Sequence, residues 1–374
     1  MMSVRARLGA GLVLVALAGL VGCAGSVKPK PEPLQPLTPT LAIKQAWSVH
    51  VSGVEFPLSV AVTSAGFAVA SDDGTVLMLE PQSGAEVWRG KVDDKLSAGV
   101  GSDGRYAAVV TREGELVVLD QGRVKWRKLL GARVVTAPLV AGERVFVVGV
   151  DRTTQAFDVL DGRKLWVLAR PGDPLTLAQS GVLGAFKDTL IVGQGARMAG
   201  VEPLRGTVRW DAVVGSPRGA NEIERLADLV GPMARVGDLV CARSFQAAVG
   251  CVDAERGTTV WSRNVGGIDA VAADAHLVVA ADASDRITAW KTPTGEVAWT
   301  TDKLLYRTLG SPLLSGRSVV FGDADGTVHW LASESGEAQL RLPTDGGAIM
   351  VAPVQAAGTT LVVTRRGGLF GFRP

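Results

Sequence analysis

The feature that most constrains the fold of this chain is an internal repeat that begins after residue 40 and runs to the end of the sequence. Each copy contains a glycine turn, an alternating apolar strand, a second glycine turn and a strand with a tryptophan, as in residues 73–88. These tryptophans recur about every 40 residues, at Trp47, Trp88, Trp126, Trp166, Trp210, Trp261 and Trp299. Such an interval holds four short strands with their turns. A sheet this small must stack on its neighbours to bury both faces, which predicts a β-propeller.

The two ends of the repeat region predict the number of blades. A seventh unit has Leu340 where the others have tryptophan. Residues 366–372 then form a turn and a strand, and the sequence stops before another tryptophan strand, whereas residues 42–49 supply such a strand with Trp47. We therefore predict an all-β, eight-bladed propeller of four-stranded antiparallel blades, closed by N- and C-terminal strands that share the last blade. A seven-bladed ring would leave one of these strands unpaired.

The recurrent tryptophans are candidate ligand-stacking groups because of their large flat rings. Their recurrence at one repeat position instead favours packing between neighbouring blades, where each ring supplies a large apolar surface. Trp290 and Trp330 lie outside this position, and we expect them to pack in the core as well.

The first 22 residues have the features of a targeting segment. Arg5 and Arg7 precede an uncharged run from residue 8 to residue 21, which is short for a transmembrane helix. Cys23 follows Leu-Val-Gly, the pattern of a bacterial lipobox. We predict that residues 1–22 are a lipoprotein signal peptide and that Cys23 is lipidated; the alternative is an ordinary secretory signal with an incidental cysteine. Ala24 in place of aspartate predicts sorting to the outer membrane.

Residues 23–40 are predicted to be the lipidated cysteine and a tether. Prolines at positions 29, 31, 33, 36 and 39 favour the polyproline II conformation over pairing in a sheet. At about 3.1 Å per residue, residues 24–40 would reach roughly 50 Å. The predicted domains are thus the signal peptide, this tether, and a propeller over residues 41–374.

The composition argues against several function classes. The net charge is only +2, with no basic stretch suited to nucleic acid. The three histidines are scattered, and no nucleotide-binding, hydrolase or zinc-protease motif is present. Residues 72–74 and 323–326 faintly resemble calcium loops but lack the later ligands, so we interpret them as hairpin turns. We predict no enzymatic activity, no cofactor and no metal.

Cys241 and Cys251 flank a predicted hairpin around Gln246. The periplasm is oxidising, so a disulfide is chemically feasible there. A three- or five-residue loop centred on Gln246 would place the two side chains opposite each other, whereas a two-residue turn would direct them to opposite faces. The sequence leaves both arrangements open.

The longest interval between tryptophans lies before Trp261 and contains an insertion over residues 218–228. This insertion alternates charged side chains with Ile223 and Leu226. Long loops on a rigid scaffold tend to carry function. We predict a binding loop here; the alternative is a solvated loop with a short helical turn.

The glycine–tryptophan repeats resemble the blades of pyrroloquinoline-quinone-dependent dehydrogenases and of the BamB family, lipoproteins of the machine that inserts β-barrel proteins into the outer membrane. The resemblance to the BamB family covers the lipobox, the proline-rich segment and all eight repeats. Residues 222–228, Glu-Ile-Glu-Arg-Leu-Ala-Asp, are similar to the family's Glu-Ile-Asp-Arg-Leu-Ser-Asp loop, and residues 304–307, 311–313 and 322–330 also match closely. A dehydrogenase would need a funnel calcium site and often a vicinal cysteine pair, and the chain has no Cys-Cys sequence.

The BamB resemblance implies a partner and the residues that bind it. In the family, this loop and a neighbouring one bind the periplasmic POTRA domains of the barrel subunit BamA. The positions that carry over are Leu175, Leu177, Glu222, Arg225 and Asp228. An arginine of the family's Leu-x-Leu-Arg pattern falls on Ala178, and an acidic position falls on Val230, so the contact is not expected to be identical.

We therefore expect a non-enzymatic scaffold lipoprotein of the BAM complex, anchored at the periplasmic face of the outer membrane. Unfolded outer-membrane proteins are further candidate partners, through pairing at exposed strand edges. Two other functions remain open: a quinoprotein-type enzyme, and a propeller that binds a small ligand in its central channel.

Overall fold

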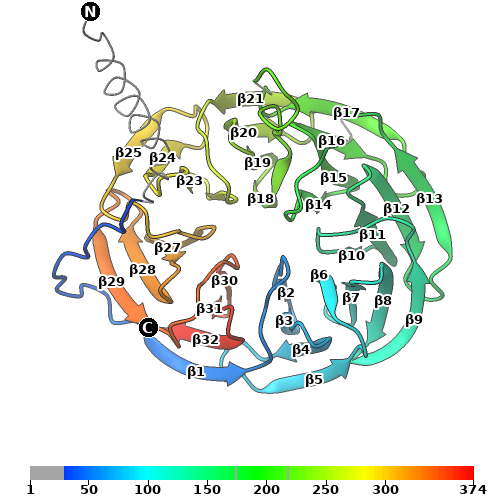
Figure 1. Ribbon diagram of the computed structural model, residues 1–374, viewed down its shortest axis with the longest axis horizontal. Helices are drawn as coiled ribbons and strands as arrows, with labels where there is room; N and C mark the ends of the chain where they lie inside the picture. Colours follow the sequence, from blue (N-terminus) through cyan, green and yellow to red (C-terminus); the bar gives the residue numbers. More distant parts are fainter. Residues whose placement is uncertain (1–28, 173–174, 217–218) are drawn as a thin grey trace, which may run out of the picture. The chain divides into compact units, whose positions relative to one another are not determined.

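The blades of the predicted repeat are present as eight four-stranded antiparallel sheets arranged in a ring (Figure 1). This computed structural model describes residues 29–172, 175–216 and 219–374, so the predicted signal peptide and Cys23 lie outside the described residues. Glu32–Pro374 form one compact unit. In the described ranges, no helix is long and apolar enough to span a membrane.

The first four blades follow one another along the chain, each with its first strand nearest the centre (Figure 1). Their strands are β2 (Ala61–Thr63), β3 (Gly66–Ala70), β4 (Thr75–Leu79) and β5 (Glu86–Lys91); β6 (Leu96–Ser102), β7 (Tyr106–Thr111), β8 (Glu115–Asp120) and β9 (Arg123–Leu129); β10 (Leu139–Ala141), β11 (Arg144–Val148), β12 (Thr153–Asp158) and β13 (Lys164–Ala169); and β14 (Leu183–Phe186), β15 (Thr189–Gln194), β16 (Arg197–Val201) and β17 (Val208–Val213).

The next three blades continue in the same way. Their strands are β18 (Leu229–Val236), β19 (Leu239–Ser244), β20 (Ala248–Asp253) and β21 (Thr258–Arg263); β22 (Ala272–Ala273), β23 (Leu277–Ala281), β24 (Ile287–Lys291) and β25 (Val297–Thr301); and β26 (Leu313–Ser315), β27 (Ser318–Gly322), β28 (Thr327–Ala332) and β29 (Ala338–Pro343).

The eighth blade closes the ring with both ends of the chain. It contains β30 (Val354–Ala356), β31 (Thr359–Val363) and β32 (Gly368–Arg373), with β1 (Lys44–His50) as its outer strand. β1 pairs antiparallel with β32, so that Ser48 lies opposite Phe370. The predicted fold class, blade number and shared closing blade are confirmed.

Stacking of the blades explains which strands are buried. All residues of β3, β4 and β7 are buried because both faces of these middle strands pack against a neighbouring blade. The outer strands have exposed residues instead, as in β9 and β21. The core is therefore a ring of apolar layers between the blades.

Six of the seven recurrent tryptophans dock on a glycine of the next blade, which confirms the predicted packing for them; Trp88 does not make this contact. Trp166 donates a hydrogen bond from Nε1 to the carbonyl oxygen of Pro203 in the next blade, at 2.9 Å. Its ring covers Gly206, which has a φ of +75° and where an added Cβ would lie 2.6 Å from the indole. The same contact recurs at five other interfaces, which join Trp47 to Gly84, Trp126 to Gly162, Trp210 to Gly257, Trp261 to Gly295 and Trp299 to Gly336. Trp290 and Trp330 are fully buried, as expected.

A disulfide joins Cys241 to Cys251. The two residues are directly paired across β19 and β20, with their Cα atoms 4.0 Å apart. The turn between Ser244 and Ala248 contains three residues and has Gln246 at a φ of +50°. It is therefore the three-residue alternative that forms, and it sets both sulfur atoms on the same face.

One side of the ring carries the longer loops, and we call it the connection face. In an antiparallel four-stranded blade, the turn between the second and third strands lies at the same end as the link from the fourth strand to the next blade. The connection face thus includes the turns 149–152, 282–286 and 323–326 and the connections 170–182, 214–228 and 302–312.

Part of the proline-rich segment packs on the propeller. We call residues Glu32–Thr40 the strap. Its two ends form backbone hydrogen bonds, from the Glu32 N–H to the Leu305 carbonyl and from the Thr40 N–H to the Gln339 carbonyl, both at 2.9 Å. The free reach predicted for residues 24–40 therefore does not apply to residues 32–40, because composition predicts an extended backbone but not whether it docks.

Candidate functional site

Two connections predicted to bind a partner lie on the connection face, after β13 and β17. The first carries Leu175 and Leu177, and the second carries Glu222, Arg225 and Asp228. Leu175 is 37% exposed, and Ile223 of the second connection is 74% exposed. Both connections therefore present apolar side chains to solvent.

Asp228 ties the two connections together. Its Oδ2 accepts a hydrogen bond from the Leu177 N–H at 3.0 Å, and its Oδ1 lies 3.4 Å from Nη1 of Arg152. Arg152 also donates from Nη2 to the Leu175 carbonyl at 3.4 Å. The side chains of Arg152 and Asp228 are only 13% and 17% exposed. The ion pair is thus shielded and fixes the backbone of Leu175 and Leu177.

Arg152 is a functional candidate that the sequence reasoning missed. It lies in the turn between β11 and β12 with a φ of +65°, a conformation that is uncommon for a side chain larger than glycine. Its backbone carbonyl accepts a hydrogen bond from Gln194 at 3.2 Å. The repeat pattern does not distinguish this turn from the other turns. Arg152 is therefore identified only by its positive φ and its contact with Asp228.

Glu222 and Arg225 lie at the exposed tip of the second connection, in a single hydrogen-bonded turn such as the alternative interpretation also expects. The Arg225 N–H bonds to the Asn221 carbonyl at 3.2 Å, and Asn221 Oδ1 accepts the Glu224 N–H at 2.9 Å. In the part of the chain that the structure describes, no hydrogen bond or ion pair joins these two side chains to Leu175 or Leu177. Their side chains are directed to solvent and available to a partner.

The base of the second connection is held rigidly. The Leu229 N–H bonds to the Gly195 carbonyl at 2.9 Å, and Ser244 Oγ donates to the Ala227 carbonyl at 2.6 Å. A small cavity of about 60 Å³ is bordered by Thr176 and other residues of both connections. These hydrogen bonds fix the end of the second connection to the propeller.

The two positions that depart from the family pattern have different surroundings. Ala178 is exposed and borders the central channel. Val230 is 1% exposed and paired with Arg243 in the sheet. Because Val230 is part of the core, its lack of charge does not change the exposed surface of the two connections.

The central channel opens among the inner strands and has a cavity of about 520 Å³. Phe56, Arg133, Gln179 and Asp269 contribute to its lining. Burial raises the pKa of Asp269 to about 6. Among the described residues there is no group of histidine, cysteine or acidic side chains that could hold a metal ion.

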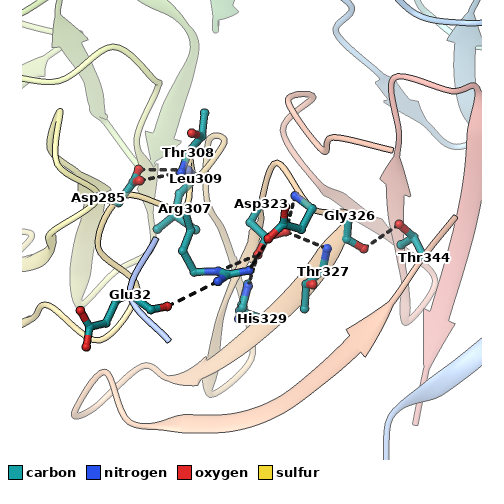
Figure 2. Close-up of polar contacts among 11 residues, drawn as sticks. Glu32, Asp285, Arg307, Thr308, Leu309, Asp323, Gly326, Thr327, His329 and Thr344 are labelled. Atoms are coloured by element: carbon teal, nitrogen blue, oxygen red, sulfur yellow. Dashed lines mark hydrogen bonds and ion pairs between the residues drawn. The ribbon is translucent and has the colours of Figure 1, made fainter. Parts of the chain in front are cut away.

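The segment that faintly resembles a calcium loop at residues 323–326 forms a buried polar network (Figure 2). Oδ2 of Asp323 accepts hydrogen bonds from Nε of Arg307 and from His329, both at 2.9 Å, while Oδ1 accepts the Thr327 N–H at 2.8 Å. The side chains of Arg307 and Asp323 are 8% and 0% exposed. The carboxylate therefore binds the chain's own donors, as expected of a turn.

The protonation of this network follows from its burial. Burial opposes ionisation of Asp323, but the hydrogen bonds from His329 and Thr327 hold its pKa below the usual value. Burial also lowers the pKa of His329, against the attraction of Asp323. At neutral pH, Asp323 is thus charged and His329 is neutral, with Nε2–H as the donor to Asp323.

Comparison with known proteins identifies the family. A family model described as "Outer membrane protein assembly factor BamB" matches residues 72–301. A protein of that name from Burkholderia pseudomallei is 34% identical over 92% of this chain and 91% of its own length. The chain belongs to the BamB family. Another BamB, from Bordetella pertussis, is 32% identical over 96% of this chain and 95% of its own length.

Solved structures show the same architecture as this BamB-family chain. BamB from Moraxella catarrhalis superposes with a TM-score of 0.80 at 24% identity, covering 89% of this chain and 100% of that one. A quinohemoprotein alcohol dehydrogenase from Comamonas testosteroni has a TM-score of 0.66 at 15% identity, covering 88% and 76% of the two chains. The dehydrogenase likeness is one of fold.

Proposed function

We propose that this BamB-family protein is a non-enzymatic scaffold of the outer-membrane β-barrel assembly machinery that binds the periplasmic POTRA domains of BamA. Its relatives are named as outer membrane protein assembly factors. Lipidation at Cys23 anchors it to the periplasmic face of the outer membrane. Its binding assists the insertion of outer-membrane proteins, and unfolded substrates are further candidate partners.

The observation that carries this proposal is the fixed pairing of the two connections through Asp228. A scaffold gains affinity when its contact residues are ordered before the partner arrives, because less entropy is lost on binding. Asp228 and Arg152 order the backbone of Leu175 and Leu177, and the exposed side chain of Leu175 is a suitable apolar anchor. Glu222 and Arg225 add a polar rim around it.

A binding experiment tests this assignment. The mature protein without Cys23 is titrated with the periplasmic region of BamA from the same organism, in parallel with Leu175→Ala/Leu177→Ala and Arg225→Glu variants. A matched control is Leu204→Ala, since Leu204 is 59% exposed but lies in the turn before β17, outside both connections. Circular dichroism and thermal unfolding check that each variant is folded.

We expect the double leucine variant to lose about tenfold or more in affinity, since a buried apolar anchor is worth about 1.5–3 kcal/mol. Arg225→Glu should slow association in a salt-dependent way. Leu204→Ala should bind as the wild type does. Absence of binding by a folded wild type at micromolar concentration would overturn the partner, whereas equal binding by all variants would move the site away from the two connections.

A further inference from the structure

The strap is attached to the propeller by contacts of three kinds. Besides the backbone hydrogen bonds at its two ends, Arg341 donates from Nη1 to the Gln35 carbonyl at 2.6 Å. Leu34 is half-buried against the apolar cluster that contains Leu304 and Leu309. The contacts extend over the whole strap, so its path is determined at several points.

The end of the strap that is nearer to Cys23 lies beside the buried polar network. Nη1 of Arg307 is 3.5 Å from the Glu32 carbonyl oxygen, and Nε of the same guanidinium binds Asp323 (Figure 2). Its Nη2 binds Asp325 at 2.8 Å. The backbone before Leu309 is itself held, because Asp285 accepts the N–H groups of Thr308 and Leu309. Arg307, which contacts Glu32, is therefore held both by its own ion pairs and by the hydrogen bonds of the two residues that follow it.

Topology assigns this end of the strap to one side of the ring. Leu305 and Arg307 belong to connection 302–312, and Asp323 belongs to turn 323–326, both of which lie on the connection face. The other end of the strap contacts Gln339, near the start of β29 and hence near the opposite face. The strap therefore begins on the connection face, between blades 6 and 7, and ends near the opposite face.

We propose that the docked strap sets the orientation of the propeller at the membrane, by holding the connection face toward the lipid surface. This inference rests on the proposed lipidation of Cys23. Only nine backbone steps separate Cys23 from Glu32, and they span at most about 32 Å when fully extended. If the strap were released as far as Lys44, the same calculation would give about 75 Å, and the anchor would orient neither face.

The first experiment asks whether the strap is docked in solution. The substitution Glu32→Pro removes the backbone N–H donor and suits the surrounding prolines. A triple variant combines it with Leu34→Asp and Arg341→Ala. The matched control is Glu32→Ala, which keeps the N–H. Hydrogen exchange of the Thr40 amide should be about tenfold or more faster in the triple variant than in the wild type and control. Amides of β11 should be unchanged. Exchange of the Thr40 amide in the wild type at the rate of an unprotected amide would overturn the proposal.

The second experiment measures orientation without relying on bacterial lipidation. Because Cys241 and Cys251 form the disulfide, Cys23 of the oxidised mature chain is the one thiol left for coupling to a maleimide lipid in phosphatidylcholine vesicles. A fluorophore on an unnatural amino acid is placed at Ala283, exposed on the connection face, or at Glu334, exposed in the turn before β29 on the opposite face. Energy transfer to a headgroup acceptor reports each distance to the bilayer.

Transfer from position 283 should exceed that from position 334 by about twofold or more, because a blade is about 20 Å deep. In the triple variant the two efficiencies should become equal. Equal efficiencies in the wild type, or an unchanged difference in the triple variant, would overturn the proposal. Binding of BamA and mass-spectrometric detection of lipid on Cys23 are measured separately, so failure of the proposed function is distinguished from failure of this orientation.

Discussion

Replacement of Arg307 by methionine should destabilise the propeller by about 3 kcal/mol at pH 7.5. Breaking a buried ion pair by removal of one partner costs about 3–5 kcal/mol, because a charge is left without compensation. Asp323 is fully buried and would keep its hydrogen bonds from Thr327 and His329, which places the cost at the lower end of this range. Asp325 is 69% exposed, so loss of its contact adds little.

The experiment is urea unfolding of the chain without residues 1–23, followed by tryptophan fluorescence and circular dichroism. The matched variant is Arg307→Met/Asp323→Asn, which removes the buried charge but keeps an oxygen for the turn. We expect it to be more stable than Arg307→Met by about 1–2 kcal/mol, because the double variant leaves no buried charge without compensation.

The same pair predicts a dependence on pH. The folded-state pKa of Asp323 is depressed, so its contribution to stability is present above the unfolded value of 3.8 and is lost as the pH falls through the folded value. Without Arg307 the folded pKa of Asp323 rises, and the stability difference between wild type and Arg307→Met should narrow on acidification from pH 7.5 toward 4.5. A cost below about 1 kcal/mol, or a double variant less stable than Arg307→Met, would refute the role assigned to the buried charge.

Two further predictions concern stability. Gly206→Ala should lower the free energy of unfolding by about 2–4 kcal/mol, because the new Cβ would strain a positive φ and press on the Trp166 ring. The control Gly142→Ala, also at positive φ but with no atom nearby, should lower it by only about 1 kcal/mol, and equal costs would contradict inter-blade docking as the cause. Reduction of the Cys241–Cys251 disulfide, which closes a loop with a sequence separation of 10, should lower the free energy of unfolding by about 2.7 kcal/mol, and an unchanged urea midpoint with dithiothreitol would contradict this.

The fold could be predicted from sequence because two features follow from the blade geometry: the recurrent glycine–tryptophan pair and the incomplete repeat units at the two ends. Gly206 is required by the close approach of the Trp166 ring, and the same pair of residue types recurs at each docked interface. The incomplete units at the two ends then determine the blade number, since β1 completes the sheet that β32 begins. The sequence did not determine whether Cys241 and Cys251 form a disulfide, because this depends on whether the turn at Gln246 contains two or three residues. Composition does not reveal the length of that turn.

The candidate site was predictable only in part. Leu175 and the tip at Arg225 are exposed, which both the binding loop and the solvated loop would allow. Nothing in the repeat indicated that Asp228 bonds to the backbone of Leu177. Arg152 comes from a different blade, and its position opposite Asp228 depends on the three-dimensional stacking. Docking of the strap was missed for the same reason, since Leu34 and Arg341 are distant in sequence from the residues they contact.

The closing blade has a consequence for the order of folding. β1 is the first of the described strands to be synthesised, yet its hydrogen-bonding partner is β32, the last of them. Pairing of segments so far apart in sequence makes folding slow, because a long loop must close before the contact forms. Seven blades can therefore assemble while β1 still has an unpaired edge, and the folding chain can misassemble until β32 is available to pair with it. A truncation that removes Gly368–Arg373 would leave the ring in that unfinished state.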